Sequence, residues 1–248
     1  MTDLQCDYPD HDIAAVVPIT AVTPDNLVDH VAVEAGSISQ LVAQWRRLAP
    51  TIEMLFPAAH KRFPTGGQRS SRRGKAVEQA CARIKKGTLI SIGIPVDFGT
   101  VENVDWENDP TGKNFEWPWQ LNRLTEWVPL AVCAENGDRE AGDALLTMLR
   151  SWLQIPVPLA ADGHASRAHR TIDTGIRMAG ALPTVLPWLL RNADDVLLAE
   201  LMANLMTSQQ RLRWNHREGN WLTMEMNGLF ASTFYLPFAR ETEELRDY

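Results

Sequence analysis

From Glu116 onward, apolar residues recur at helical spacing with no strand-like sequence between them. The pattern predicts five successive helices, over about 118–135, 138–153, 168–191, 194–213 and 221–236. Asp138 and Asp194 stand where an N-cap is expected, and Pro156 and Pro158 follow the second of these helices. Helices joined by such short connections pack as antiparallel neighbours, so we expect an all-α chain of stacked helical hairpins. Periodicity alone does not distinguish a bundle from a solenoid or a double-layered toroid.

The N-terminal part of the chain is more varied. Residues 1–36 hold seven acidic side chains, three prolines and no Lys or Arg, which predicts an extended arm. Ser37 then precedes apolar residues at helical spacing and Pro50 follows them, so we expect a first helix here and a helical domain over 37–248. A loop over 63–74, a short helix over 75–86 and one strand over 88–94 complete the expected elements.

Charge is distributed unevenly along the chain. The formal net charge is -7, yet residues 61–86 hold nine basic side chains against Glu78 alone. A locally basic face of this kind can bind a polyanion, either an acidic polysaccharide or a nucleic acid. The alternative is a solvated helix face beside a loop rich in Arg, Ser and Gly. No nucleic-acid-binding motif accompanies the segment, so nucleic acid is not an expected partner.

Several function classes lack support in the sequence. The longest uncharged runs, 13–24 and 178–190, are too short to span a bilayer, so no membrane association is expected. The motifs of dinucleotide-binding proteins, P-loop enzymes, zinc proteases and serine hydrolases are missing, and we expect no cofactor. His164 and His169 are five residues apart, which does not suit two metal ligands on one helix face, so no metal site is expected.

The cysteines and the N-terminus bear on the compartment. Cys6, Cys81 and Cys133 are odd in number, far apart in sequence and in no CxxC pair, which argues against a disulfide framework and predicts reduced core thiols. The first residues show no secretory signal. Either the protein stays in the cytoplasm or a leader is missing from this sequence.

A tryptophan-rich segment, 105–127, is the first candidate for chemistry. It holds four of the nine Trp residues among amide and charged side chains. Aromatic faces cover the apolar faces of sugar rings, while amide and guanidinium groups bind hydroxyls and carboxylates. The alternative is that Trp117 and Trp127 only anchor a helical core. The candidate glycan contacts in this segment are Trp106, Trp119, Gln120, Asn122 and Arg123.

A polar turn at 215–219, which leads into the helix expected near residue 221, is the second candidate. Asn220 could be no more than a helix N-cap. The residues crowded around the same helix start favour a functional role instead: His216, Arg217, Trp221, Glu225 and Asn227.

Five motifs in order make the chain resemble the heparinase II/III-type polysaccharide lyases, most closely their heparan-sulfate-lyase branch. The motifs are DWxxDP from Asp105, WPWQLNR from Trp117, Asn136-Gly-Asp with Ser151-Trp152 following, IDTGIR from Ile172 and GNWLTMExNGL from Gly219. The resemblance covers roughly 95–240. It implies an incomplete (α/α) toroid that is normally followed by a large antiparallel β-sandwich domain, which we expect to be missing from this sequence.

The resemblance also implies a reaction. Lyases of this kind cleave uronate-containing polysaccharides by β-elimination, in which a donor neutralises the uronate carboxylate, a Tyr or His removes the C5 proton and an acid protonates the leaving oxygen. Asn220 matches the carboxylate-neutralising Asn of the family. Arg177 becomes a further candidate glycan contact, although its spacing also suits an ion pair with Asp173 on one helix face. Trp221 and Glu225 complete the expected substrate-binding residues.

The catalytic base is where the chain departs from the family pattern, because the family's Tyr and His lie in parts that this sequence does not contain. Tyr8 and Tyr248 are terminal, and Tyr235 is expected to pack inside the last helix. His216 is the substitute candidate. The chain alone is therefore expected to bind an acidic glycan, with turnover an open question.

Two alternatives to the lyase remain. One is a noncatalytic acidic-glycan-binding module or degenerate lyase. The other is a glycoside hydrolase on an (α/α) toroid, which needs two carboxyl groups flanking the bond, with Glu225 and Asp109 as the nearest candidates. Family resemblance favours the periplasm or the cell exterior as the compartment, in contrast to the missing leader.

Overall fold

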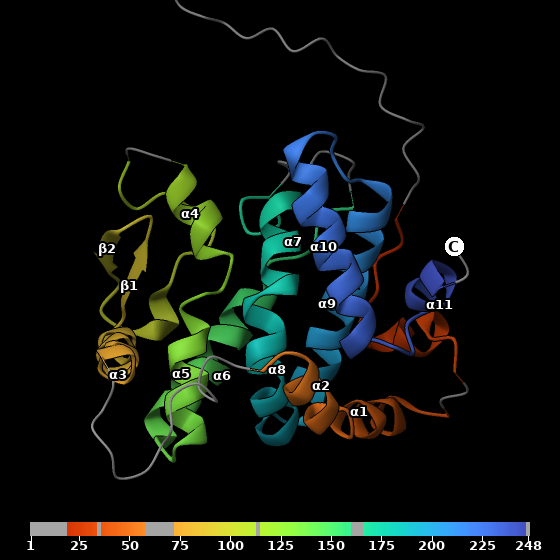
Figure 1. Cartoon of the computed structure of the whole chain (residues 1–248), viewed down its shortest axis with the longest axis horizontal. Coiled ribbons are helices and arrows are strands. Elements are labelled where there is room, and N and C mark those ends of the chain that lie inside the picture. Colours follow the sequence, from red (N-terminus) through yellow and green to blue (C-terminus); the bar gives the residue numbers. More distant parts are fainter. Residues whose placement is uncertain (1–18, 34–35, 58–71, 113–114, 160–165, 247–248) are drawn as a thin grey trace, which may run out of the picture.

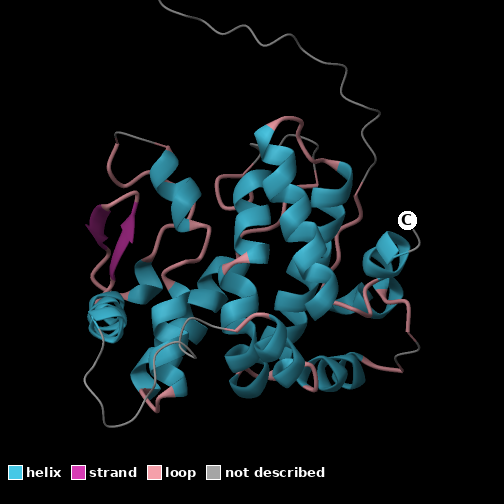
Figure 2. Cartoon of the chain, viewed as in Figure 1, coloured by secondary structure: helices cyan, strands magenta, loops and turns pink. Residues whose placement is uncertain are grey.

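The computed structural model describes residues 19–33, 36–57, 72–112, 115–159 and 166–246, and these are mostly helical with one small sheet (Figures 1 and 2). The all-α class is thereby confirmed. The elements in chain order are η1 (Pro24–His30), α1 (Ile38–Arg46), α2 (Ala49–Leu55), α3 (Arg72–Lys85), β1 (Thr88–Ser91), β2 (Ile94–Asp97), η3 (Val101–Asn103), α4 (Glu116–Leu121), α5 (Trp127–Glu135), α6 (Arg139–Leu153), α7 (Thr171–Ala179), α8 (Ala181–Asn192), α9 (Asp195–Trp214), α10 (Asn220–Tyr235) and α11 (Arg240–Arg246), where η denotes a 3-10 helix.

Three helices begin where their N-caps predicted. The Ser37 hydroxyl accepts a hydrogen bond from the Gln40 amide at 3.3 Å at the start of α1. The carboxylates of Asp138 and Asp194 accept from the amides three residues later, at 3.1 and 2.8 Å, at the starts of α6 and α9. Each side chain satisfies a backbone donor that the first helical turn leaves without a carbonyl partner.

Two of the predicted long helices are each divided in two. The segment 118–135 forms α4 and α5 with Leu124 at a left-handed φ of 59° between them, and 168–191 forms α7 and α8 with a break at Gly180. Pro118, Pro129 and Pro183 are each the third residue of a helix. Proline fits the first turn of a helix, where its missing N–H has no carbonyl to meet. The prolines therefore mark helix starts within what periodicity presents as single helices.

The single predicted strand is a two-stranded antiparallel hairpin. Thr88–Ser91 pairs with Ile94–Asp97, and Ile92 and Gly93 form the turn with φ of 48° and 77°. Positive φ at both turn residues is the geometry of the two-residue hairpin turns that match strand twist. A second element was not predicted at all: α2 begins just before Pro50, which occupies its first turn.

The described part of the acidic N-terminal segment packs on α9. The amide of Val22 donates to the Thr207 hydroxyl at 3.0 Å, and Leu27, within η1, is fully buried. Val31 forms an isolated antiparallel bridge with Ala239. Residues 19–33 thus lie against the helices rather than extending from them, and residues 1–18 of the predicted arm fall outside the described residues. The domain boundary at residue 37 stays a prediction.

Tryptophan side chains anchor the hydrophobic core. Trp45, Trp117, Trp127 and Trp152 are fully buried. The ring of Trp127 packs edge-to-face against Trp152 and Trp106, with centroids 5.7 and 6.4 Å apart. Edge-to-face contact is a preferred geometry for aromatic pairs. The core role considered for Trp117 and Trp127 is therefore confirmed.

Helices α7 and α10 pack backbone to backbone. A Cβ atom added to Gly228 would lie 2.4 Å from the Cα of Gly175, and one added to Gly175 would lie 2.4 Å from the Met224 carbonyl oxygen. Only glycine permits so close an approach. The two helices lie side by side and begin at the same end of the molecule, toward which α4 also points (Figure 1). None of the helices described is long and apolar enough to cross a membrane.

Candidate functional site

The starts of α7 and α10 and the helix α4 meet around one arginine. The guanidinium carbon of Arg170, the residue just before α7, lies 3.8 Å from the ring centroid of Trp119 and 5.4 Å from that of Trp221. Cations lie favourably over indole faces at these distances. Two predicted glycan contacts, a hundred residues apart in sequence, are thus joined by an arginine that sequence reasoning did not single out.

A buried carboxylate fixes this arginine. Asp173 is fully buried, and its Oδ2 accepts a short hydrogen bond from Arg170 Nε. Its other oxygen accepts from Arg123 Nε at 2.7 Å, and the Arg123 side chain remains a quarter exposed. Hydrogen bonds from two guanidinium groups offset the cost of burying the carboxylate charge. The arrangement presents Arg123 to the surface.

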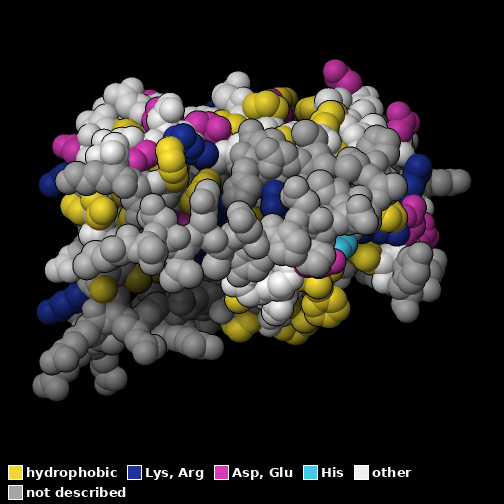
Figure 3. Space-filling view, turned by 90° about the horizontal axis from the view of Figure 1, so that it is seen from above, with side chains coloured by type: hydrophobic (Ala, Val, Ile, Leu, Met, Phe, Trp, Pro, Cys, Tyr) yellow, Lys and Arg dark blue, Asp and Glu magenta, His cyan; other side chains and the backbone are white. Residues whose placement is uncertain are grey.

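Further charged groups line the same end of the molecule. The guanidinium of Arg167 lies 4.4 Å from the Phe115 ring centroid and donates to the Glu107 carbonyl at 3.1 Å. Glu116 lies 3.5 Å from Arg170 Nη1. Figure 3 views the molecule from this side, where basic and acidic side chains alternate with apolar ones on the described surface. The guanidinium groups on this surface can bind an anionic group of a ligand.

Asn220 is the first residue of α10, and its side chain is exposed. The N-cap position belongs to Gly219, which has a φ of 78°, and no side chain caps the helix. The alternative in which Asn220 is only an N-cap is therefore wrong. Gly219 turns the chain sharply enough to present the Asn220 carboxamide at the surface beside Trp221, which faces Arg170.

His216 lies in the exposed turn before α10. Its Nδ1 lies 2.9 Å from the carbonyl oxygen of Arg213, and because a carbonyl only accepts, Nδ1 carries the proton. In the neutral ring Nε2 is then the atom with the free electron pair. The geometry prepares an exposed imidazole to accept a proton at Nε2.

Glu225 is fully buried, one turn into α10. Its Oε2 accepts from the backbone amide of Arg217 at 2.7 Å and so ties the turn 216–219 to the helix. Burial raises the pKa of the Glu225 carboxyl above its ordinary value, although the Thr171 hydroxyl and this amide oppose the shift. The side chain positions the turn, and its burial keeps it from direct contact with a large substrate.

Asn122 and Trp106 are buried and hold α4 in place. The Asn122 amide donates to the carbonyls of Trp106 and Pro118 at 2.8 and 2.7 Å, and its oxygen accepts from Trp152 Nε1 at 3.0 Å. The indole of Trp106 donates to the Ser151 hydroxyl at 3.0 Å. Their polar groups are engaged by the protein, so both lie beneath the surface that Trp119, Gln120 and Arg123 form above them.

Arg177 is also buried and belongs to this supporting layer. It donates to the Ala168 carbonyl at 2.7 Å and to His169 Nδ1 at 2.9 Å. Since Arg177 only donates, His169 carries its proton on Nε2, which donates to the Ile155 carbonyl at 3.1 Å. Arg177 interacts with Asp173 through charge, but the hydrogen bonds of Asp173 go to Arg170 and Arg123. Burial, followed by the charge of Arg177, holds the pKa of His169 well below its ordinary value.

The residues missed from the sequence are Arg170 and Arg167. Asp173 had been considered only as a partner of Arg177. A signal for Arg170 existed, because it stands two residues before the motif that begins at Ile172. Its importance depends on the packing of three separate helices, which no local pattern in the sequence reports.

The basic segment 61–86 is only partly described. In α3, Arg83 pairs with Glu126 at 2.8 Å, and Lys85 pairs with Asp138 at 2.8 Å and Glu140 at 3.0 Å. Lys75 and Lys86 are exposed. Residues 61–71 of the segment lie outside the described residues. Within the described ranges, no three His, Cys, Asp or Glu side chains gather as metal ligands would.

Comparisons with known proteins identify the family and the fold. The profile described as heparinase II/III N-terminus matches residues 65–248. The heparan sulfate lyase HepC of Pedobacter heparinus is similar in structure, with a TM-score of 0.65 and 19% sequence identity over 91% of this chain and 37% of that chain. A mutant of HepC gives the same values. A heparinase III gene product with methylated lysines matches with a TM-score of 0.63 and 16% identity over 90% of this chain and 38% of that one. No curated protein sequence matches significantly.

The chain spans little more than a third of the length of these solved structures. At identities below 20% the likeness concerns the fold. On the surface formed by α4 and the starts of α7 and α10, Arg170 and Asp173 join three of the predicted site residues, Trp119, Arg123 and Trp221.

Proposed function

Since the chain belongs to the heparinase II/III family, we propose that it is the glycan-binding N-terminal part of a lyase that cleaves a uronate-containing polysaccharide, such as heparan sulfate, by β-elimination. Family and fold relate the chain to polysaccharide lyases. The proposal adds the substrate class, the reaction and the residues. Its main support is Asn220, whose exposed carboxamide begins α10 without serving as the helix cap.

The chemistry explains the need for such a group. The C5 proton of a uronate is barely acidic while the neighbouring carboxylate keeps its full charge. In the reaction a base takes this proton, a C4–C5 double bond forms, and the bond from C4 to the leaving oxygen breaks. A hydrogen-bond donor on the carboxylate stabilises the charge that develops. We assign this role to the Asn220 carboxamide.

The surrounding side chains bind the polymer in this proposal. Trp119 and Trp221 both contact Arg170, and their indole rings could pack against sugar rings. Arg123 and Gln120 are partly exposed beside them and supply donors for carboxylate, sulfate or hydroxyl groups. The partly exposed guanidinium group of Arg123 favours a negatively charged glycan.

His216 is the base that this chain can offer. Its Nε2 is unprotonated in the neutral tautomer that the Arg213 carbonyl selects. Tyr235, by contrast, is fully buried and donates to the Met178 carbonyl at 3.0 Å, which agrees with its expected packed position. Burial raises the pKa of Tyr235, so this phenol stays neutral and inaccessible.

The same proposal covers the wider organisation. We place the described helices in an incomplete (α/α) toroid that functions together with the longer remainder present in the solved relatives, and we place the protein in the periplasm or outside the cell. The hydrolase alternative loses support because the Glu225 carboxyl is buried under the 216–219 turn.

The test is the ultraviolet absorbance of the unsaturated uronate during incubation of the chain with heparan sulfate, heparin, alginate and chondroitin. Calorimetric binding is measured in parallel for the wild type, Asn220→Ala and the matched control Asn227→Ala, an exposed Asn on the same helix. We expect Asn220→Ala to weaken binding about fivefold, in line with one lost hydrogen bond of about 1 kcal/mol. Where turnover occurs, the variant should lose about 10²–10³ in rate.

Each outcome decides a part of the proposal. Binding that only Asn220→Ala weakens, without absorbance, supports the binding site and makes the chain the recognition part of an enzyme whose base lies elsewhere. Turnover that His216→Ala abolishes assigns the base to His216. Absence of binding to every uronate polymer, or equal loss in Asn227→Ala, would overturn the assignment of Asn220.

A further inference from the structure

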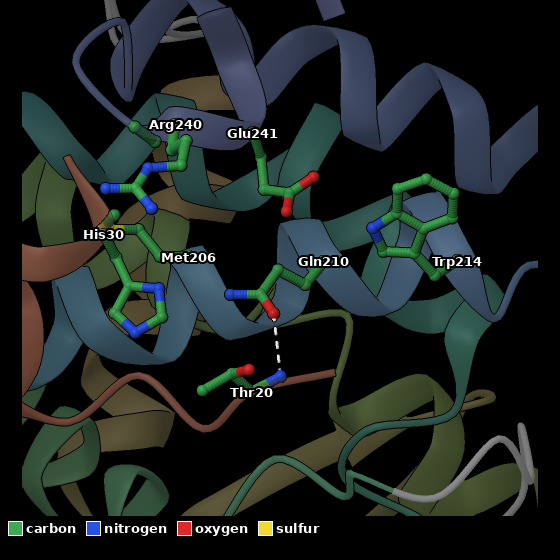
Figure 4. Close-up of a pocket in the computed structure, with 8 residues that line it drawn as sticks. Thr20, His30, Met206, Gln210, Trp214, Arg240 and Glu241 are labelled. Atoms are coloured by element: carbon green, nitrogen blue, oxygen red, sulfur yellow. Dashed lines mark hydrogen bonds between the residues drawn. The ribbon is translucent and has the colours of Figure 1, made fainter. Parts of the chain in front are cut away.

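A cavity is formed by elements other than those of the α4, α7 and α10 surface. The cavity, of about 250 Å³, opens between η1, α9 and α11, and none of the residues that line it belongs to the candidate site (Figure 4). It is smaller than the roughly 300–1,000 Å³ typical of pockets for drug-sized ligands. Its size therefore suits one ring rather than an oligosaccharide.

One face of α9 forms the cavity floor. Met206, Gln210 and Trp214 follow one another at four-residue spacing and so lie on the same side of the helix. The Gln210 oxygen accepts from the Thr20 amide at 3.0 Å, which fixes the orientation of the carboxamide. Its NH₂ group consequently points toward the space between His30 and Arg240 (Figure 4). A buried amide thus presents a donor to the cavity.

Two charged side chains of α11, Arg240 and Glu241, line the cavity. Within the described ranges Arg240 forms no ion pair, whereas its neighbour Glu241 is engaged by Arg213 at 2.7 Å. Burial, followed by the charge of Arg240, holds the pKa of the half-buried His30 below its ordinary value. A neutral imidazole can both donate and accept a hydrogen bond. The cavity therefore offers one guanidinium, one amide donor and one imidazole on the same side.

An aromatic surface stands at the other side. Trp214 is 40% exposed, and Arg213 lies 4.3 Å from its ring centroid, which helps to hold the indole in place. In Figure 4 its ring lies beyond Glu241, opposite His30 and Arg240. An indole face combined with a guanidinium and an amide donor matches a sugar ring that carries a carboxylate.

We propose that this cavity is a second glycan-binding site, which holds a single uronate ring with its carboxylate on Arg240, its hydroxyls on Gln210 and His30, and its ring face toward Trp214. The choice of ligand rests on the proposed function, since it assumes the same class of acidic glycan. The site would hold the polymer at a distance from the reacting residue and so increase binding without taking part in the chemistry.

The test uses the full chain and D-glucuronate as the probe. Indole N–H signals in ¹H–¹⁵N correlation spectra report on both sites at once, and Trp214 is assigned by the signal missing in Trp214→Phe. We expect glucuronate to shift the Trp214 signal with a millimolar Kd, and Arg240→Gln to weaken this at least tenfold. Arg139→Gln, an exposed arginine on α6, is the matched control and should leave the titration unchanged.

Comparison with other ligands and variants separates the outcomes. Glucose in place of glucuronate should not shift the signal, and Asn220→Ala should leave the Trp214 titration intact even where it weakens polymer binding. A Trp214 signal that does not respond to glucuronate overturns the second site, and so does an unchanged response in Arg240→Gln. Equal affinity for inorganic sulfate would reduce the cavity to a general anion site and overturn the uronate assignment.

Discussion

The Arg170 guanidinium shows how one residue can organise a surface. It lies within cation–π distance of the rings of Trp119 and Trp221 and is held by the buried Asp173. Removing a charge from a buried pair leaves the partner without compensation, whereas exposed pairs contribute little. Arg170 therefore supports both the stability of the helix junction and the placement of two aromatic side chains.

We predict that Arg170→Gln lowers the free energy of unfolding by about 3 kcal/mol, because Asp173 then keeps one of the two guanidinium groups that hydrogen-bond to it. Urea denaturation measures the change. Arg150→Gln breaks an exposed pair with Asp194 and should cost less than about 1 kcal/mol. Similar losses of unfolding free energy in the two variants would show that the buried Arg170 pair contributes no more to stability than the exposed Arg150 pair.

His169 gives the protein a dependence on pH. Its folded-state pKa lies well below 6.5, mainly because the ring is buried, so below that pH the unfolded chain binds a proton that the folded chain does not. Stability should then fall by about 1.4 kcal/mol per pH unit below roughly pH 6.5, until the lowered pKa is reached. Urea denaturation between pH 7.5 and 5.5 tests this. In His169→Gln the free energy of unfolding should change less steeply with pH, by the contribution of one proton. Equal slopes would contradict it.

Individual site residues were predictable from the sequence to different degrees. Trp119, Arg123 and Trp221 could be selected because aromatic and basic side chains cluster near them. Asn122 could be selected for the same reason, yet its side-chain amide is hydrogen-bonded inside the protein. Residue type and neighbouring residues identify the segment that forms the site. Which of its side chains are exposed depends on which face of α4 packs inward, and six residues are too few to show a clear apolar face.

At the scale of elements, the positions of prolines indicated the helix boundaries better than the spacing of apolar residues did. The divisions between α4 and α5 and between α7 and α8 each precede a helix with proline at its third residue. Proline alone does not dictate a break, since α8 continues through Pro187. The hairpin was predicted as one strand because Ile92, a β-branched residue, occupies a turn position with positive φ.

The contact between α7 and α10 leads to a prediction about glycine. Gly228→Ala would place a Cβ against Gly175, which requires the helix backbones to separate. We expect a net loss of about 2 kcal/mol, since overpacking outweighs the gain in helix propensity. Gly36→Ala, whose Cβ would meet only the flexible Gln40 side chain, should change stability by less than about 0.5 kcal/mol. Thermal unfolding of both variants tests this, and an unchanged Gly228→Ala midpoint would refute the tight contact.

At the scale of the whole molecule, five motifs in order were enough to predict the family and the all-α class. The remaining organisation was not predictable, because it depends on which distant segments pack together. The cysteines illustrate this. Cys81 and Cys133 are far apart in sequence, yet they lie on the packed helices α3 and α5 and their thiols hydrogen-bond to each other as free cysteines.

We predict that oxidation with a small-molecule disulfide joins Cys81 to Cys133 by two successive exchanges, which release two equivalents of the reduced thiol. Closing a loop of this length restricts the unfolded chain and should raise the free energy of unfolding by about 2–4 kcal/mol. Mass spectrometry should identify the linked peptides of Cys81 and Cys133. Cys133→Ser is the control. Absence of the linked peptides after oxidation would exclude the link.

The glycine contact of α7 with α10 also fixes how the two helices are rotated and shifted relative to each other. Because the backbones touch at Gly175 and Gly228, neither helix can slide or rotate along the other. Arg170 lies five residues before one contact point, and Trp221 lies seven residues before the other. One inserted residue in either interval would rotate the side chain by about 100° and move it about 1.5 Å along the axis. The number of residues from Arg170 to Gly175 and from Trp221 to Gly228 is therefore fixed by the need to keep the two side chains together. The length of the loops before these helices is not restricted in this way.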